Sequence, residues 1–391
     1  MRNEMDMRKA RSMAAEFVTN GHPDKCCDQM ADAIVDTALS QDPKSRVAME
    51  VTGGHGGIVV IGEMTTCAVF DIGEVVRRTY RAIGHDHDLA IFTNVVKQAK
   101  NIAQGVDDEK AVGKGHAEQG AGDQGIMVGY AVNDTPEFMP LTWSIAKRLC
   151  LMMHDLRVDG TLPWLRPDGK SQVTIVDGKI THVTLAAHHA LKFSPDTPEE
   201  KAELAQIRIE LFNRIVRPVV PDLGNVDMVA AGEDPCVVIN GTGRFVQGGF
   251  DADAGTTGRK LMVDNFGPNV EIGGGCYSGK DPTKVDRSAA YFCRFIAKSI
   301  VAGGYAREAI VKVGYAIGVA KPTYVSVQTS LPDDEARKLE ANVLDKFDFR
   351  PKAIIERLGL IDSNKDWRYE DTARFGHYGD SRFPWETPVS F

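Results

Sequence analysis

The feature that most constrains the fold is a repeated alternation between strand pairs that turn on glycine and helices of ordinary length. Residues 46–52 and 57–66 read as strands on either side of a glycine-rich turn, and two strand-like runs within 171–189 flank Asp177-Gly178. Asp-Gly between such runs is a strong hairpin signal. Because hairpins join antiparallel strands, the alternation predicts an α+β layered fold rather than a doubly wound parallel sheet. Helical spacing is found at 24–40, 71–83, 198–216 and 286–302, and further strands are predicted at 236–240, 260–266, 309–319 and 323–329.

One long stretch fits neither pattern. Residues 98–125 are rich in glycine and polar side chains and have only weak periodicity. Loops of this length in compact domains are usually mobile or carry ligands. We therefore predict a mobile loop here that covers a site.

Charge and cysteine usage exclude several classes of protein. The net charge of −8 argues against a surface whose main task is to hold a nucleic-acid backbone, and no run of about 18 apolar residues is present to cross a membrane. Seven cysteines without a C-x-x-C pair are a poor basis for disulfides or a zinc site. A reduced, cytoplasmic setting is therefore expected.

The first candidate site is Gly21-His22-Pro23-Asp24-Lys25, directly before the first predicted helix. Free N–H groups and the helix dipole favour anions there, so a histidine, a carboxylate and an ammonium suit a metal-bound phosphate chain. Aspartates follow at four-residue steps along the helix. Taken alone, this segment favours the plainer interpretation of a capped helix with a solvated acidic stripe formed by Asp24, Asp28, Asp32 and Asp36.

Two glycine-rich segments are candidates for close backbone contact with a ligand. Residues 120–125 place three glycines around Asp123, which also fits a flexible turn. Residues 274–280 match most of a phosphate-binding P-loop, but Asp281 stands where a serine or threonine is required and Pro282 follows. Another kind of phosphate-binding loop, with Lys280 and Lys284 as cations, stays open beside a plain surface loop.

A fourth segment, residues 241–260, combines glycines with an aromatic and basic residues. Phe245 could stack on a base and Arg259 could bind phosphate. Taken singly, however, such a phenylalanine is more often a core residue and such an arginine more often a surface residue. His188-His189 end a strand-like run and have no partners at a recognisable metal-ligand spacing. Nothing in the sequence resembles a Ser-His-Asp or Cys-His nucleophile site.

Together these segments resemble the S-adenosylmethionine synthetase family. The motifs that carry the resemblance are GHPDK at 21–25, GAGDQG at 120–125 and GGGCYSGKD at 273–281. Further matching stretches, in family order, are 160–168, 170–173, 242–245, 284–291 and 383–386. They span nearly the whole chain.

The resemblance implies three similar α+β domains around a pseudo-threefold axis, with mixed, mostly antiparallel sheets and helices on one face. By analogy the chain divides into residues 12–109, 119–248 and 250–391, with 98–119 as the mobile active-site loop. Members are typically homodimers or homotetramers with active sites at the subunit interface, and the expected reaction makes S-adenosylmethionine from ATP and L-methionine, with tripolyphosphate then hydrolysed to phosphate and pyrophosphate.

The resemblance also assigns roles to residues. His22 contacts the triphosphate, Asp24 and Asp286 hold two magnesium ions, and Glu50 holds one potassium ion. Positions that resemble methionine-binding residues are Glu63, Gln98, Asp253 and Lys284. Positions around the adenosine are Asp123, Arg244 and Phe245, and the cationic ring around the phosphates is Lys170, Arg259, Lys260, Lys280 and Lys284.

The chain departs from the family pattern in two places. Thr19-Asn20 precedes the first motif where members often have Ser-Glu, and Gln98-Ala99-Lys100-Asn101 replaces a common Gln-Ser-Pro-Asp at the start of the loop. The second change reverses a local charge and puts loop dynamics and turnover in doubt. Two other hypotheses are a non-catalytic ligand-binding paralogue, against which the complete charged set argues, and a P-loop kinase, against which Asp281 argues.

Overall fold

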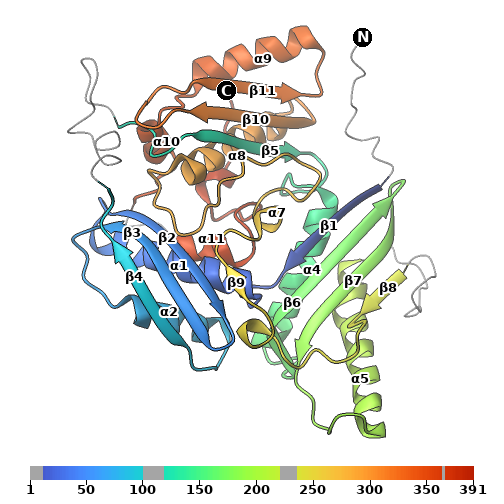
Figure 1. Cartoon of the computed structure of the whole chain (residues 1–391). Helices are drawn as coiled ribbons and strands as arrows, with labels where there is room; N and C mark the ends of the chain where they lie inside the picture. The colour runs from blue at the N-terminus through green and yellow to red at the C-terminus, as the bar shows by residue number, and fades with distance from the viewer. Residues whose placement is uncertain (1–11, 100–118, 221–235, 363–365) are drawn as a thin grey trace.

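The computed structural model describes residues 12–99, 119–220, 236–362 and 366–391, and in it three small sheets surround a common centre (Figure 1). The first sheet has the order β4-β3-β2-β9 and the second the order β1-β6-β7-β8, while the third has the order β11-β10-β5. Most neighbours are antiparallel, but β3–β4 and β7–β8 are parallel. The strands are β1 Ser12–Val18, β2 Arg46–Gly54, β3 Gly57–Thr65, β4 Ala90–Val96, β5 Gly125–Val132, β6 Leu165–Val176, β7 Lys179–His189, β8 Cys236–Ile239, β9 Gly255–Thr256, β10 Glu308–Tyr315 and β11 Tyr324–Thr329.

Each sheet takes one strand from a distant part of the chain. Strand β1 pairs with β6, with Val18 opposite Lys170, and β5 pairs with β10, with Gly125 opposite Tyr315. The short β9 pairs with β2, with Thr52 opposite Thr256. The three-domain α+β fold is as expected, but its sheets are interlinked across the chain. The division into residues 12–109, 119–248 and 250–391 stays a prediction.

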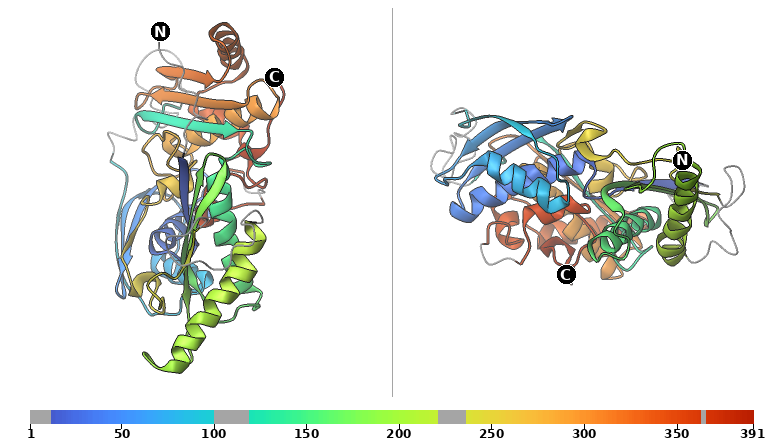
Figure 2. Two further views of the ribbon diagram at one scale, coloured as in Figure 1. Left: turned by 90° about the vertical axis from the view of Figure 1, so that its right-hand side faces the viewer. Right: turned by 90° about the horizontal axis from the view of Figure 1, so that it is seen from below.

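The helices cover the sheets and fill the centre. Helices α1 and α8 are buried along most of their length, and α8 packs on β5 and β10. Figure 2 shows α5 and α9 at opposite ends of the molecule. No helix of the described residues is long and apolar enough to span a membrane. The helices are α1 Pro23–Gln41, α2 Ile72–Ile83, α4 Leu141–Val158, α5 Pro198–Leu211, α6 Arg217–Val219, α7 Leu261–Asp264, α8 Val285–Ala302, α9 Asp333–Lys346, α10 Pro351–Arg357 and α11 Tyr369–Arg374, with a π-helical turn at Phe212–Val216.

The strongly periodic predictions are confirmed. Helices α1, α2 and α8 and the hairpins β2–β3 and β6–β7 lie where periodicity placed them, and Asp177-Gly178 forms the tight turn with both φ angles positive. The predicted strand at 260–266 is wrong, because 261–264 form the short helix α7. The predicted strand at 309–319 ends at Tyr315. Most of the predicted long loop lies outside the described residues.

The interpretation of the aspartate stripe on α1 as a solvated face is also wrong. Asp24, Asp28 and Asp32 are fully buried and accept backbone N–H groups from Thr256, Gly258 and Gly279, each at 2.9 Å. Asp36 accepts the N–H groups of the first two residues of α11, also at 2.9 Å. The acidic face of α1 therefore holds the C-terminal third of the chain in place.

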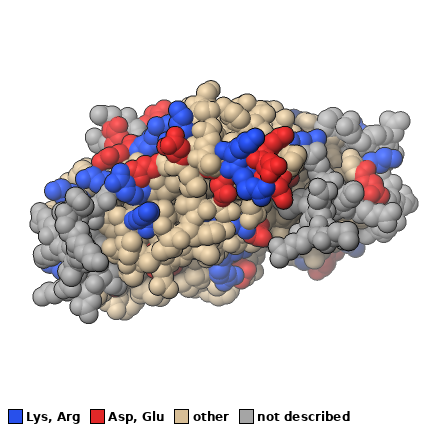
Figure 3. Space-filling view, turned by 90° about the horizontal axis from the view of Figure 1, so that it is seen from above, with Lys and Arg blue, Asp and Glu red and all other residues tan. Residues whose placement is uncertain are grey.

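On the surface, charges of both signs are interspersed. The described part of the face in Figure 3 shows lysine and arginine beside aspartate and glutamate over a largely uncharged background, with no broad field of one sign there.

Candidate active site

The first group of predicted site residues forms around the start of α1. The Asp24 carboxylate lies 2.6 Å from the Lys260 ammonium and 3.2 Å from the Arg259 guanidinium. His22 is the N-cap of α1, and its Nδ1 accepts the N–H of Asp24 at 3.2 Å. We call His22, Asp24, Arg259 and Lys260, with Lys170 and Asp253 at their edge, the His22 group.

Local sequence explains why these segments meet. Pro23 at the first position of α1 fixes the helical φ where no N–H is needed. Strand β9 then passes so close that a Cβ on Gly255 would lie 2.2 Å from the Pro23 carbonyl oxygen. Only glycine permits this approach, which places Arg259 and Lys260 over the start of the helix.

Electrostatics keep His22 neutral and Asp24 charged. Burial and the nearby Lys260 lower the pKa of His22 to about 4, and Lys170 acts in the same direction while Asp24 and Asp253 oppose it. Burial tends to raise the pKa of Asp24, but hydrogen bonds from Lys260 and Thr256 outweigh it and lower that pKa. At neutral pH the centre of the group, inside Lys170 and Asp253 at its edge, therefore presents a neutral imidazole and the two cations Arg259 and Lys260 beside the Asp24 carboxylate.

Histidine burial has a consequence for stability. Burial is the main cause that lowers the pKa of His22, His154 and His188 from 6.5 to about 4. Between these values the unfolded chain binds more protons than the folded one, so the free energy of unfolding should fall as pH drops from 6.5 to 4. His188→Gln should remove up to about 1.4 kcal/mol per pH unit of that slope. Urea unfolding at several pH values measures it, with the exposed His182→Gln as the control that should leave the slope unchanged.

A second group of predicted residues lies at the loop before α8. The Lys280 ammonium is 2.6 Å from the Asp286 carboxylate. Burial tends to lower the pKa of Lys280, but the nearby Asp286 raises it, and Asp123 adds to that effect, so the pKa lies above its usual value. Lys280 also forms a backbone bridge with Ala48 on β2, the strand that carries Glu50. We call Glu50, Asp123, Lys280 and Asp286 the Lys280 group.

Gly275 makes room for Asp286 in this group. A Cβ on Gly275 would lie 2.3 Å from the Asp286 Oδ1 atom, and its backbone φ is ordinary, so the only objection to a larger residue is steric. Gly275→Ala should displace the carboxylate and lower the turnover number at least about tenfold, since misplaced charge stabilisation is costly. Steady-state kinetics test this, with Gly73→Ala on α2 as the control. Unchanged turnover in Gly275→Ala would contradict the placement of Asp286.

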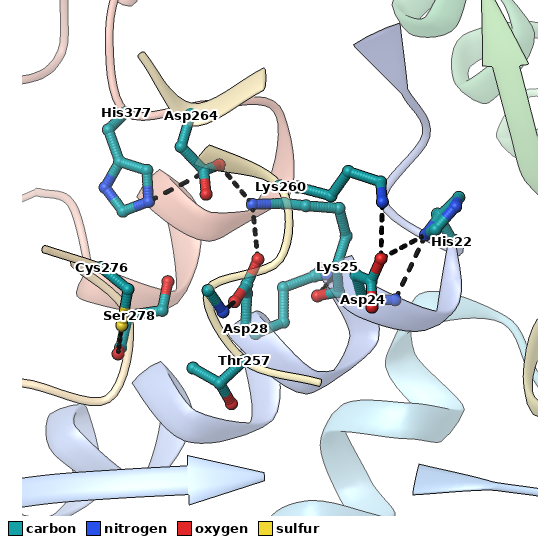
Figure 4. Close-up of polar contacts among 12 residues, drawn as sticks. His22, Asp24, Lys25, Asp28, Thr257, Lys260, Asp264, Cys276, Ser278 and His377 are labelled. Carbon is teal, nitrogen blue, oxygen red and sulfur yellow. Dashed lines mark hydrogen bonds and ion pairs between the residues drawn. The ribbon is translucent and has the colours of Figure 1, made fainter. Parts of the chain in front are cut away.

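Between the two groups lies a buried ionic cluster that the sequence did not reveal. Figure 4 shows the Lys25 ammonium between the carboxylates of Asp28 and Asp264, at 3.0 and 2.5 Å, with His377 on the far side of Asp264. Burial raises the pKa of both carboxyls, while Lys25 opposes the rise. Lys25 belongs to the first motif, but 239 residues separate it from Asp264, so no local pattern could pair them.

The remaining predicted residues, and Lys170 at the edge of the His22 group, have contacts of their own. Arg244 is held by Glu200 and Asp196, and Phe245 stacks on His188 with ring centroids 5.3 Å apart. Lys284 is buried and pairs with Asp281 at 2.7 Å. Lys170 pairs with Glu16 at 2.7 Å at the rim of the β1–β6 pair. Gln98 follows β4, and Glu63 lies on β3 opposite Ala48.

The donor set is suited to a metal that arrives with phosphate. No cluster of three or more histidine, cysteine or acidic side chains that could hold a metal occurs in the described ranges. Asp24 and Asp286 instead stand singly, each beside cations. Magnesium commonly takes one or two protein carboxylates and completes its shell with phosphate oxygens and water. The two groups fit that pattern and offer fixed cations for a polyphosphate.

Comparison with known families agrees with this chemistry. Residues 10–105, 118–245 and 247–387 match the models of the S-adenosylmethionine synthetase N-terminal, central and C-terminal domains. The chain is 43% identical to the S-adenosylmethionine synthase of Clostridium tetani, with 97% of each chain covered. It is also 43% identical to the synthase of Thermus thermophilus and 42% identical to that of Thermosynechococcus vestitus, with 94–97% of each chain covered.

Proposed function

The chain belongs to the S-adenosylmethionine synthetase family, and we propose on this premise that it joins ATP and L-methionine into S-adenosylmethionine at a site built from the His22 and Lys280 groups. The observation that carries the proposal is the setting of Asp24, a fully buried carboxylate held beside the Lys260 and Arg259 cations at a helix start. Such a site stabilises a large anion that develops charge.

The chemistry explains what these side chains do. The thioether sulfur of methionine is neutral, so its attack on C5′ of the ATP ribose forms the C–S bond of a sulfonium without removal of a proton. The C5′–O bond breaks and its electron pair goes to the leaving tripolyphosphate. Cations and oriented donors are therefore needed at the leaving oxygens, and a general base is not. His22, neutral at pH 7, can donate from Nε2 because its Nδ1 accepts from Asp24 N–H.

Magnesium, when bound with ATP, would neutralise phosphate charge, and we propose that Asp24 and Asp286 hold the two ions. Lys170, Arg259, Lys260, Lys280 and Lys284 would serve as the cationic ring, and Glu50 would hold potassium. Asp123, Arg244 and Phe245 would surround the adenosine. The methionine would contact Glu63, Gln98, Asp253 and Lys284. Hydrolysis of the tripolyphosphate to phosphate and pyrophosphate before release completes the proposed reaction.

We propose further that the site is completed by a second copy of the chain. Strand register places side chains of β2, β3 and β4 together on one face of the first sheet. The neighbouring pairs there are Glu50–Ile61, Ala48–Glu63, Val59–Phe92 and Glu63–Val96. Val59, Ile61, Phe92 and Val96 are 41–60% exposed on this face. An apolar face of this kind usually marks an interface. A homodimer or homotetramer formed through it would bring a partner's His22 group to Glu50 and Glu63.

A cytoplasmic location completes the proposal. Six cysteines of the described residues are free, and four of them are buried. Free cysteines in this number are typical of reducing compartments.

An end-point assay tests the function. The protein is incubated with ATP, L-methionine, magnesium and potassium, S-adenosylmethionine is followed by mass, and phosphate and pyrophosphate are followed by ion chromatography. We expect all three products, and none of the S-adenosylmethionine when methionine is omitted. A folded protein that binds S-adenosylmethionine but makes none would overturn the proposal in favour of a binding paralogue.

A further inference from the structure

A cavity of about 430 Å³ lies between α4 and the segment that contains α11, and none of its lining residues belongs to the His22 or Lys280 group. Its walls combine two kinds of surface. Leu151, Phe375 and the His154 ring supply apolar contact, and Lys147, Arg374 and Arg382 supply positive charge. None of the last three was singled out by sequence, and none has a role in the proposed reaction.

Lys147 is the cation in this wall that lacks a close carboxylate. Its ammonium donates to the Tyr378 carbonyl at 3.0 Å and lies 4.8 Å from the centre of the Trp143 ring. Among the described residues it forms no ion pair within 4 Å. Burial lowers its pKa to about 8, with Arg294 adding to the effect and Asp380, Glu386 and Glu137 opposing it. A cation in this position gains from an anionic partner.

The other charges in the wall do not neutralise it. Arg382 is paired with Asp380 at 2.7 Å, but Arg374 lies 3.8 Å from Asp371, beyond hydrogen-bond distance. Burial holds the pKa of His154 at about 4, so its ring is neutral at pH 7. Three cations face two carboxylates, which leaves one positive charge in excess.

We propose that this cavity is a binding site for a small organic anion, whose anionic group is bound by Lys147 and Arg374 and whose apolar body packs on Leu151 and Phe375. The cavity volume is several times that of a free phosphate ion. The apolar part of its wall includes the rings of His154 and Phe375, whose centroids are 5.2 Å apart. Both features favour a phosphorylated or carboxylated molecule with an apolar part over an inorganic ion.

The site borders the first motif without belonging to it. His154 Nδ1 lies 3.1 Å from the Asn20 Oδ1 atom, and Asn20 is one of the two positions where the chain departs from the family before GHPDK. The cavity wall therefore includes a residue that contacts the segment leading to His22.

The test uses 4-fluorophenyl phosphate as probe, followed by fluorine NMR on the full-length protein without ATP or methionine. Binding should be detectable at millimolar probe and should weaken about tenfold or more in Lys147→Met, which keeps an unbranched side chain one atom shorter and removes the ammonium. Arg374→Gln, at a side chain 40% exposed, should weaken it severalfold and provides a test if the first variant does not fold. Lys280→Met removes any probe bound at the proposed phosphate subsite of the active site and should leave intact the binding that Lys147→Met weakens.

Several outcomes would overturn the proposal. The first is a titration of wild-type protein that gives no shift of the fluorine signal, and the second is binding to both cavity variants that equals wild-type binding. The third is loss of all binding in Lys280→Met, which would assign the probe to the phosphate subsite of the active site. 4-Fluorobenzoate and inorganic phosphate, run in parallel, separate a carboxylate from a phosphoryl preference. Because no turnover is measured, the result is independent of the proposed function.

Discussion

Asp24→Asn should reduce the rate of S-adenosylmethionine formation by about 10²–10³-fold. The change is isosteric and keeps an oxygen that can accept the Thr256 N–H, so the helix start should survive. It removes the only carboxylate that faces both Lys260 and Arg259 within the described His22 group, and with it the charge proposed to hold magnesium. Initial rates measured at saturating ATP, methionine and magnesium give the effect.

Circular dichroism and the unfolding midpoint of the same variant show whether it is folded. Asp334→Asn, on the exposed start of α9, is the matched control and should keep full activity. A folded Asp24→Asn protein with near-wild-type rates would refute the assignment of Asp24 and weaken that of Lys260 with it.

Arg287→Leu should lower the free energy of unfolding by about 3–5 kcal/mol. Arg287 and Asp32 are both fully buried, and the guanidinium makes two hydrogen bonds to the carboxylate, at 2.7 and 2.6 Å. Removal of the arginine leaves the Asp32 carboxylate buried, with the Gly279 N–H as its remaining hydrogen-bond donor among the described residues. Equilibrium unfolding in urea measures the loss.

The double variant Arg287→Leu/Asp32→Leu separates the ion pair from packing. It removes both charges and should recover part of the stability, because an apolar pair of similar volume often replaces a buried ion pair at little cost. Arg337→Leu, which breaks an exposed pair on α9, should change the free energy of unfolding by less than about 1 kcal/mol. Equal losses in Arg287→Leu and Arg337→Leu would contradict the role of the buried pair.

Sequence predicted the parts of the fold whose signals are local. The periodicity of α1, α2 and α8 and the Asp177-Gly178 turn act within a few residues, and tertiary contacts did not override them. The stretch at 260–266 contains a short apolar run at 261–263, which suits a strand. Ion pairs with Asp24 and Lys25 fix Lys260 and Asp264, however, and the segment between them forms a single helical turn.

Sequence also found the motifs of the site but not their partners. GHPDK is visible because it places a histidine, a carboxylate and an ammonium within four residues, and GGGCYSGKD because its glycines are dense; the resemblance assigned roles to their charged residues. The burial of the aspartates on α1 was missed, because an acidic stripe looks solvated until Arg287, 255 residues away from Asp32, and the loop N–H groups are placed against it. Partners so far apart in the chain leave no local pattern.

The exchange of strands between the sheets has a consequence for synthesis. When β1 leaves the ribosome it has no partner, because Val18 pairs with Lys170, and β5 waits in the same way for β10, nearly 180 residues later. Such long-range pairings slow folding, and an unpaired strand invites aggregation. The three sheets receive their last strands only at β8, β9 and β11, so the first strands of the chain must stay unpaired, and protected from association, while their distant partners are being made.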